Sequence, residues 1–240
     1  MNLIRKYLEL FKNKKYNIVV NRLDTKNDDV NYDISIKKVM NLLSYTKKSG
    51  VSYSAGKFSS GYHSFVIGKH IFKGQRDPLI RFKDLPFSLK GMTVLDIGCN
   101  QGGMLHAFSK DIRYGVGVDY DARMINAANK IKSYTKTNNI DYYVFNLENE
   151  SLEYLNDFLP EEKVDAVFLL SVCMWIQNWK EVIEFCKKIS SILIFETNGK
   201  PKQQDEQIQY LKKVYSNVQL VNERSEDDSS QKLRKLFYCS

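Results

Sequence analysis

The residues Val94-Leu95-Asp96-Ile97-Gly98-Cys99-Asn100-Gln101-Gly102-Gly103-Met104 join an apolar run, a carboxylate and a cluster of glycines. The apolar run predicts a buried strand, and the glycines predict a turn whose backbone N–H groups can approach a ligand before a helix begins. In the first strand of an open α/β sheet, such a turn lies at the carboxyl edge, where ligands bind. We therefore predict a ligand site at this turn.

The sequence after this turn continues to alternate strands with helices. Short apolar runs, typical of buried parallel strands, occupy 94–97, 114–118, 142–145, 166–170 and 192–196. Helices are predicted at 102–110, 121–135, 151–158, 179–189 and 203–214. Two further β-like runs, 218–222 and 233–239, predict a terminal antiparallel pair. The pattern predicts a doubly wound α/β domain over residues 90–240, with a mostly parallel sheet of seven strands.

Residues 1–89 predict a helical and hairpin extension in front of this domain. Apolar residues recur at helical spacing in 2–12 and 34–47, with a loop at 27–29 between them. Residues 49–62 are rich in Ser, Gly and Tyr, a composition that favours a loop able to cover a site. A short hairpin is predicted at 63–72 around Gly68, and a helix within 74–86. We expect this extension to cap the acceptor side of the site.

The net charge of +8 is divided unevenly along the chain. Residues 1–90 carry 18 Lys and Arg against 7 Asp and Glu, a net charge of +11, which leaves −3 for residues 91–240. A basic segment attracts phosphates, nucleic acid or anionic surfaces. A lysine-rich face can equally serve only to keep the protein in solution, and the sequence leaves both interpretations open.

Composition and length restrict the class of protein. At 240 residues and 43% hydrophobic content, the chain fits one α/β core with a small addition. No apolar run approaches the roughly 18 residues of a membrane span, and the start lacks the features of a secretory signal, so we expect a cytoplasmic protein. The four cysteines and three histidines show no metal-ligand spacing, so neither a disulfide nor a metal site is expected.

Two classes of ligand compete for the glycine-rich turn. The spacing of Gly98, Asn100 and Gly103 approximates the G-x-G-x-x-G pattern of dinucleotide sites with one glycine missing. Asp96 would then lie close to anionic phosphates, which is an unfavourable contact between like charges. S-adenosylmethionine carries an ammonium group and a sulfonium but no phosphate. An acidic strand end therefore favours this cofactor over a dinucleotide.

The turn resembles the first motif of the class I S-adenosylmethionine-dependent methyltransferases, an acidic residue followed by G-x-G-x-G. The motif maps onto Asp96, Gly98, Asn100 and Gly102, with Asn100 in place of the middle glycine. Asn tolerates a left-handed backbone better than most residues. The resemblance covers about residues 90–240 and implies a Rossmann-like methyltransferase fold with S-adenosylmethionine as cofactor.

A second carboxylate follows the next strand at Asp119, 21 positions after Gly98. This spacing is close to that of a ribose-binding acid, whose two oxygens can accept both ribose hydroxyls. Asp121 is the better candidate for the N-cap of the helix that follows. By resemblance to the family, Asn146 and Leu147 are candidates for the adenine. The predicted cofactor residues are Asp96, Gly98, Cys99, Asn100, Gly102, Asp119, Tyr120, Asn146, Leu147 and Ser171.

Family members line the methyl-transfer site with residues just beyond the fourth strand, which here reads Leu169 to Ile176. The family's Asn/Asp-Pro-Pro-Tyr motif for amino-group methylation is absent, which argues against adenine-N6 and glutamine-N5 acceptors. Trp175 is expected either to pack over the adenine or acceptor, or to be an aromatic at the edge of the core.

Methyl transfer from a sulfonium is an in-line displacement, so the protein mainly aligns the reactants and excludes water. A hydroxyl or protonated amine acceptor also needs a general base, for which histidine is the natural candidate. We predict His63 as this base, with Tyr62 beside it and Arg76 as a third catalytic residue.

The predicted substrate-binding residues are Arg76, Arg81 and Trp175. Arg76 and Arg81 can hold a phosphate or carboxylate in a fork geometry, and Arg76 can alternatively pair with its neighbour Asp77. Residues 74–81 show a weak similarity to the arginine-bearing lead-in of tRNA wobble-uridine carboxymethyl transferases.

The leading hypothesis is an enzyme that methylates an oxygen or nitrogen of a small or anionic acceptor, such as a sugar, a nucleotide-linked metabolite or a natural-product intermediate. An RNA-modifying enzyme is the second hypothesis, favoured by the basic first 90 residues. A cofactor-binding regulatory protein is the alternative without catalysis. The oligomeric state stays open.

Overall fold

The computed structural model describes residues 34–46, 58, 60–67, 70–228 and 233–240. The helix predicted at 2–12, the loop at 27–29 and most of the loop at 49–62 lie outside these residues, as does Gly68.

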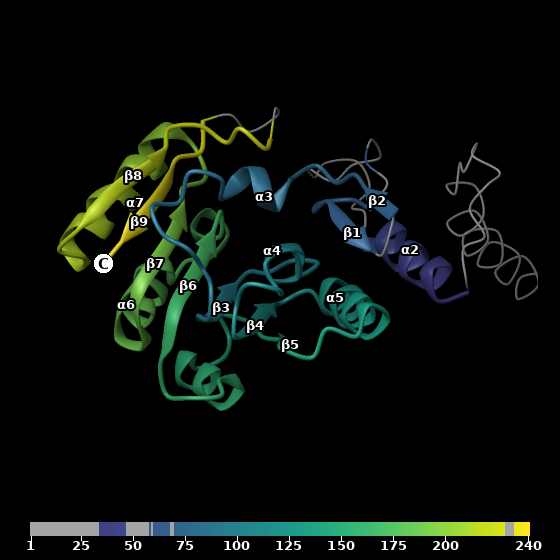
Figure 1. The fold of residues 1–240 in the computed structure, drawn as a ribbon. Helices are drawn as coiled ribbons and strands as arrows, with labels where there is room; N and C mark the ends of the chain where they lie inside the picture. The colour runs from purple at the N-terminus through teal and green to yellow at the C-terminus, as the bar shows by residue number, and fades with distance from the viewer. Residues whose placement is uncertain (1–33, 47–57, 59, 68–69, 229–232) are drawn as a thin grey trace, which may run out of the picture.

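A seven-stranded sheet with the order β5-β4-β3-β6-β7-β9-β8 forms the centre of the molecule (Figure 1). Strands β3 to β7 pair in parallel, whereas β9 lies antiparallel to both β7 and β8. This confirms the predicted fold class. The strands are β3 (Thr93–Ile97), β4 (Tyr114–Asp119), β5 (Ile140–Val144), β6 (Val164–Leu170), β7 (Ser190–Glu196), β8 (Val218–Asn222) and β9 (Leu236–Cys239).

The order of strands reverses at β3, which lies between β4 and β6. In an open α/β sheet, this reversal leaves a crevice at the carboxyl ends of the strands because the connections on the two sides leave in opposite directions. The glycine-rich turn after β3 lies at this point, as predicted.

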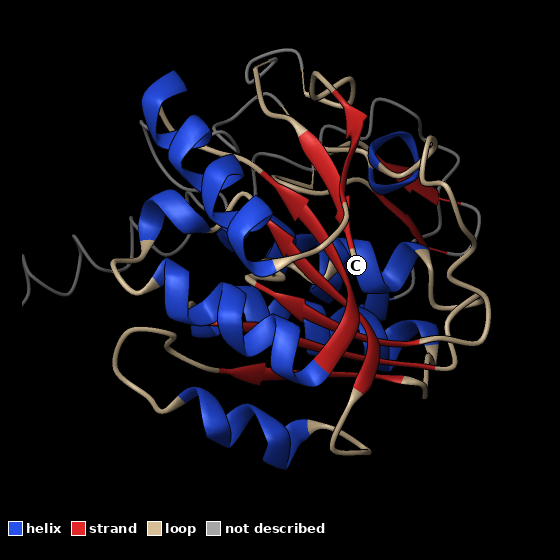
Figure 2. Cartoon of the chain, turned by 90° about the vertical axis from the view of Figure 1, so that its left-hand side faces the viewer, coloured by secondary structure: helices blue, strands red, loops and turns tan. Residues whose placement is uncertain are grey.

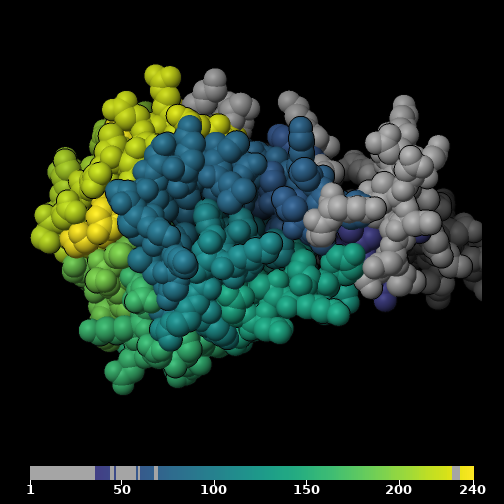
Figure 3. Space-filling model, in the orientation of Figure 1, coloured from purple at the N-terminus to yellow at the C-terminus, as the bar shows by residue number. Residues whose placement is uncertain are grey.

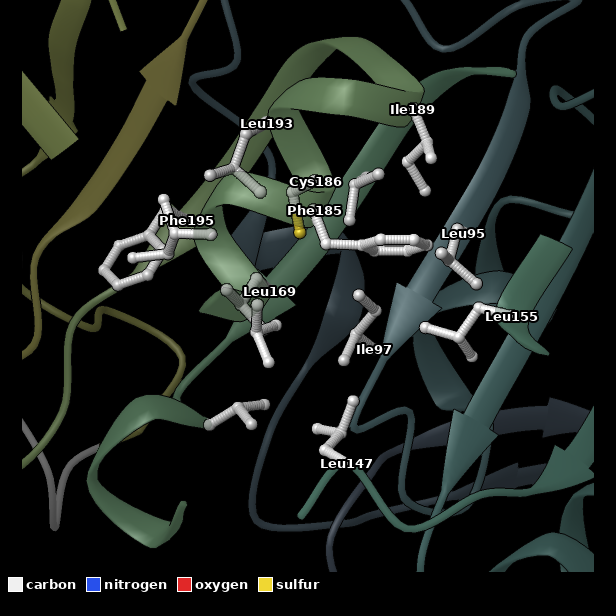
Figure 4. Packing of buried hydrophobic residues seen from close by; sticks show 14 of the residues in the cluster. Leu95, Ile97, Leu147, Leu155, Leu169, Phe185, Cys186, Ile189, Leu193 and Phe195 are labelled. Atoms are coloured by element: carbon white, nitrogen blue, oxygen red, sulfur yellow. The ribbon is translucent and has the colours of Figure 1, made fainter. Parts of the chain in front are cut away.

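Helices pack on both faces of the sheet (Figure 2), because every residue of β3 is buried and both faces of the strand must be covered. On one face, Leu95, Ile97 and Leu169 pack with Phe185 and other residues of α6 (Figure 4). A second cluster on the other face includes Met104 and Ile125. The helices are α4 (Gly103–Ala107), α5 (Ala122–Thr135), α6 (Trp179–Ile189) and α7 (Pro201–Val214). Within the described ranges, no helix is both long and apolar enough to cross a membrane.

The helix predicted at 151–158 is present at Leu152–Phe158 as a 3-10 helix. One other segment differs from prediction. The helix predicted within 74–86 shrinks to the four residues of α3 (Pro78–Arg81). The reason is that residues 75 and 76 form backbone hydrogen bonds with residues 61–64, so a helix can begin only after Asp77, which caps it by accepting N–H bonds from Leu79 and Ile80.

The N-terminal elements pack directly against the sheet domain. The predicted hairpin is confirmed as β1 (Phe65–Ile67) paired with β2 (His70–Phe72). The blue segment before β3 lies against both the teal part of the sheet domain and the yellow C-terminal residues (Figure 3). Helix α2 (Ile34–Thr46) lies against α5, and a small apolar cluster joins α2, the hairpin and α5. The members of this cluster are Ile36, Val39, Leu43, Phe65, Ile67, Phe72 and Ile131.

The substitution Val39→Ala tests whether this cluster is part of the folded core. Val39 is completely buried, so its truncation should lower the free energy of unfolding by about 2 kcal/mol. Lys37→Ala, on the exposed face of the same helix, should change it by less than about 0.5 kcal/mol. Urea titration measures both. An unchanged value for Val39→Ala would show that α2 contributes nothing to the stability of the domain.

Candidate active site

A cavity of about 530 Å³ opens at the carboxyl edge of the sheet, a volume typical of small-molecule sites. Its floor is formed by the ends of β3, β4 and β6 and by the loop after β5. Residues from outside the sheet close it: Tyr62, His63 and Arg81 from the segment before β3, and Arg234 from the loop before β9. The cavity therefore brings together residues that are up to 172 positions apart in the sequence.

The glycine-rich turn is built as the motif requires. Gly98 and Asn100 have φ angles of 76° and 53°, in the left-handed region that glycine and asparagine adopt most readily. A Cβ on Gly98 would lie 2.5 Å from a methyl of Val172, so no larger residue fits there. Gly98, Cys99 and Asn100 all line the cavity, in agreement with their predicted place.

Gly102, a predicted cofactor residue, is not among the residues that line the cavity. Its φ is 72°, and a Cβ would lie 2.5 Å from the ring of Tyr142, whose hydroxyl donates to the Gly102 carbonyl. The last glycine of the motif is therefore required by backbone conformation and by packing against β5.

Asp119 ends β4 and is nearly buried in the cavity wall. One of its carboxylate oxygens accepts the N–H of Asn100 and the other that of Asp121, both at 2.9 Å. These two bonds fix the orientation of the carboxylate in the cavity wall. Asp121 caps α5 by accepting the N–H of Arg123, as predicted from the sequence.

Asp96 is 2% exposed and lines the cavity at the end of β3. Its Oδ2 atom has no hydrogen-bond partner among the described residues. Burial raises the pKa of Asp96 to about 7; Arg81 opposes the shift and Asp119 adds to it. The site therefore contains a buried carboxyl group that a cationic ligand would stabilise in its ionised form.

The loops after β5 and β6 form the remaining wall. The Asn146 side chain accepts the N–H of Glu148 at 3.0 Å, so it shapes its own loop while also lining the cavity. Leu147 is buried there, and Tyr120, opposite, is 65% exposed. Trp175 lines the cavity and is 57% exposed, which places it at the rim of the cavity and outside the core.

His63 points its ring into the region next to the glycine-rich turn. It lines the cavity, and neither ring nitrogen has a hydrogen-bond partner among the described residues. Burial lowers the pKa of His63 well below its ordinary value, and the charges of Arg81 and Arg76 lower it further. The imidazole is therefore neutral near pH 7. The Tyr62 ring lies edge-on to it, with 4.7 Å between the centroids.

Gln101 holds the N-terminal segment against the turn, a role that the sequence did not reveal. Its side-chain oxygen accepts the N–H groups of Tyr62 and His63, both at 3.2 Å. Its amide group donates to the Ser60 carbonyl at 2.9 Å and to the hydroxyl of Thr46. One buried amide from the motif thus fixes the backbone that carries His63.

Glu196, at the end of β7, lies in a buried cluster with three arginines. Arg76 and Arg81 each donate to it at 2.6 Å, and Arg234 lies 3.9 Å away. Burial alone would raise the pKa of Glu196, but Arg76 and Arg81 hold it well below its ordinary value. Glu196 is the last residue of an apolar strand, and Asp96 and Asp119 likewise lie at or next to the ends of their strands. This shared position was the signal in the sequence that could have identified Glu196.

Arg76 differs from its predicted role. It is completely buried, does not line the cavity and donates to both Glu196 and Asp227, the latter at 2.5 Å. It does not pair with Asp77, whose carboxylate caps α3. A guanidinium held between two carboxylates behind the cavity wall is a structural anchor, whereas Arg81 and Trp175 reach the cavity as predicted.

Ser171, also predicted from the sequence, lines the cavity and links Glu196 to Arg234. Its backbone is left-handed, with a φ of 63°, and its hydroxyl donates to Glu196 and accepts from Arg234 at 3.1 Å. The cavity lining thus contains two sets of charged residues: an acidic set, which we define by Asp96, Asp119, Asp121 and Glu148, and an arginine set, which we define by Arg81 and Arg234.

Residues 95–191 match the family model described as a methyltransferase domain. No curated protein matches the chain. The N-terminal domain of EvdMO1 with SAH bound superposes with a TM-score of 0.53 at 12% identity, over 68% of this chain and 80% of that one. The same domain in the presence of SAH and D-fucose gives a TM-score of 0.56 at 12% identity, over 73% and 89%. A SAM-dependent methyltransferase from Aquifex aeolicus gives 0.51 at 20% identity, over 69% and 91%.

The substitution Asp96→Asn tests the buried carboxyl group through the pH dependence of stability. The pKa of Asp96 is about 7 in the folded chain and about 4 in an unfolded one. The folded state therefore binds this proton more tightly, and stability is lost as pH rises through this interval. Asparagine cannot ionise, so the variant should gain roughly 1–3 kcal/mol of unfolding free energy over wild type between pH 4 and pH 8.

Urea titrations without ligand at the two pH values measure this gain. Asp157→Asn, which alters an exposed aspartate, provides the matched control and should show no such trend. A stability difference between Asp96→Asn and wild type that is independent of pH would contradict the raised pKa.

Proposed function

We propose that this chain, a class I S-adenosylmethionine-dependent methyltransferase, transfers a methyl group to an oxygen or nitrogen of a small acceptor. The match to a methyltransferase domain over residues 95–191 supports the enzyme class predicted from the sequence, and the solved structures share the fold.

The observation that carries the proposal is the pair of buried carboxylates at the ends of β3 and β4. Asp119 lines the cavity and its two oxygens are fixed by backbone N–H groups, and Asp96 has a carboxylate oxygen without a partner among the described residues. A pyrophosphate beside these groups would meet repulsion between like charges, whereas an ammonium group and a sulfonium would be stabilised. The residues therefore fit S-adenosylmethionine, which supplies an electrophilic methyl group when bound.

In this reaction the protein mainly aligns the acceptor with the methyl group and excludes water from the site. When bound, S-adenosylmethionine would supply its methyl group to the acceptor oxygen or nitrogen and would leave as S-adenosylhomocysteine, and the acceptor would lose a proton. His63 is the proposed proton acceptor, because its neutral imidazole lines the cavity with both ring nitrogens unpartnered among the described residues. Tyr62 packs against the imidazole and is proposed to position it.

The N-terminal segment is proposed to form the acceptor side of the cavity. It supplies Tyr62, His63 and Arg81, and Gln101 attaches it to the glycine-rich turn. Among small acceptors, a sugar is consistent with the EvdMO1 domain, which was crystallised in the presence of D-fucose. A nucleotide-linked or natural-product metabolite falls within the same proposal.

RNA is the alternative acceptor, supported by the net charge of +11 on residues 1–90. Two of the arginines in that count, Arg76 and Arg81, are buried in the cluster around Glu196 and do not contribute to an exposed basic surface. Retention on total RNA that persists at moderate salt would favour this alternative, because nonspecific phosphate contacts weaken steeply as salt rises.

Calorimetry tests the cofactor assignment. S-adenosylmethionine and S-adenosylhomocysteine should both bind, and NAD should not. Asp119→Asn should weaken S-adenosylhomocysteine binding about 10–100-fold, because a charge-assisted bond to a hydroxyl is lost. The exposed Asp157→Asn should leave the affinity unchanged. Preferential binding of NAD, or an unaltered affinity in Asp119→Asn, would refute the assignment.

The substitution His63→Gln tests the proton acceptor. Methyl transfer from labelled cofactor into fractionated lysate, sorted into RNA, protein and small molecules, identifies the acceptor class. With that acceptor, His63→Gln should lower kcat about 100-fold or more, because general-base catalysis typically contributes this much. The affinity for S-adenosylhomocysteine should stay within about 3-fold of wild type, since His63 is not among the residues proposed to hold the cofactor. An unchanged kcat would remove His63 from the mechanism.

A further inference from the structure

Arg81 reaches the cavity with only part of its guanidinium occupied. Its Nε and Nη2 atoms donate to the two oxygens of Glu196 at 3.1 and 2.6 Å. Its Nη1 atom forms no hydrogen bond within the part of the chain that the structure describes. The side chain is 3% exposed and lines the cavity. A ligand inside the cavity can therefore reach this donor.

The ends of β3 and β7 place Asp96 and Glu196 on the same face of the sheet. Asp96 is paired in register with Phe168 of β6, and Leu170, two residues further along β6, is paired with Glu196. Side chains that are paired in register point to the same face, and so do side chains two residues apart along a strand. The two carboxylates therefore share one face, two strands or about 10 Å apart.

The guanidinium of Arg81 lies on this face with Asp96. Phe82, the next residue, packs in the apolar cluster that covers the same face. The positive charge of Arg81 lowers the pKa of Asp96, and it acts more strongly than the carboxylate of Asp119, which raises that pKa. The two side chains are therefore close enough for their charges to interact. This part of the cavity offers an anionic group and a cationic group together.

The amino-acid part of the cofactor carries the complementary pair of charges. S-adenosylmethionine and S-adenosylhomocysteine both have an ammonium group and a carboxylate on the same carbon atom. The proposed function, on which this inference rests, places the ammonium group beside Asp96 and Asp119. The cofactor carboxylate then lies close to two protein carboxylates, which would repel it. A cation next to Asp96 removes this conflict.

We propose that Arg81 binds the carboxylate of the cofactor through its Nη1 atom while its Nε and Nη2 atoms remain paired with Glu196. A guanidinium has five N–H donors in a planar arrangement, so it can serve two carboxylates at once. Its pairing with Glu196 holds the side chain in place, which lowers the entropic cost of the contact. Arg81, predicted from the sequence to bind the acceptor, is thereby assigned to the cofactor, and the cofactor site extends beyond the predicted domain boundary at residue 90.

Decarboxylated S-adenosylmethionine isolates this contact, because it keeps the ammonium group and the sulfonium and lacks only the carboxylate. On charge alone, it should bind the acidic set at least as tightly as the complete cofactor, since it carries no negative charge. The proposal predicts the reverse. In calorimetry, wild type should bind S-adenosylmethionine about 10-fold or more tightly than the decarboxylated compound, the typical gain from a charge-assisted bond. Equal or tighter binding of the decarboxylated compound would overturn the inference.

The substitution Arg81→Gln attributes this preference to one side chain. The ratio of the two dissociation constants should fall about 10-fold, through weaker binding of S-adenosylmethionine and with little change for the decarboxylated compound. Arg113→Gln, which removes an exposed arginine, should keep the wild-type ratio. An unchanged ratio in Arg81→Gln would show that another group binds the carboxylate.

Binding of the decarboxylated compound also shows that the Arg81→Gln variant is folded. If it is not, Arg81→Lys replaces it: lysine keeps a charge beside Glu196 but lacks the planar fork that serves two carboxylates, so the ratio should still fall. A wild-type ratio in the folded lysine variant would overturn the inference alone. Failure of wild type to bind either compound would refute the proposed function, and this inference with it.

Discussion

The carboxyl ends of parallel strands lie at one edge of the sheet, and the structure depends on how the buried carboxylates at three of these ends are compensated. Asp96, Asp119 and Glu196 lie at or next to the ends of β3, β4 and β7, and all three are buried or nearly so. A buried carboxylate must be compensated or protonated. Glu196 is compensated by arginines and Asp119 by backbone N–H groups, whereas Asp96 is stabilised in its ionised form by the charge of Arg81 and keeps one oxygen without a hydrogen-bond partner among the described residues.

Because of this difference in compensation, both acidic residues and arginines line the cavity. The arginines that neutralise Glu196 come from the segment before β3 and from the loop before β9, so the same ion pairs that close the fold also bring positive charge to the cavity wall. Gln101 ties the same N-terminal segment to the glycine-rich turn. A Cβ on Gly103 would lie 2.3 Å from the Cβ of His63, so the close fit of this segment also depends on a glycine.

The sequence predicted the features that are encoded locally. The alternation of apolar runs and helices predicted the seven strands of the sheet. The glycine-rich motif alone assigned Asp96, Gly98 and Asn100 to a ligand site after β3, and all three line the cavity. Asp121 was identified as a helix cap because its position relative to the helix is a local property.

The features that the sequence did not predict depend on long-range contacts. Arg76 was interpreted as a ligand-binding residue, but its partners, Glu196 and Asp227, lie more than 100 positions away. The helix predicted within 74–86 was lost to backbone pairing with residues 61–64, which no periodicity reveals. Gly102 was assigned to the cofactor because the motif contains it, whereas its neighbour Tyr142 comes from another strand.

A crystal structure of the protein with S-adenosylhomocysteine tests most directly the claim that the two strand-end carboxylates form a site for a phosphate-free nucleoside. The account predicts both ribose hydroxyls within hydrogen-bond distance of Asp119, about 3 Å, and the amino-acid part of the ligand on the side of Asp96. Density for the ligand outside this crevice, or with its ribose turned away from Asp119, would contradict the account.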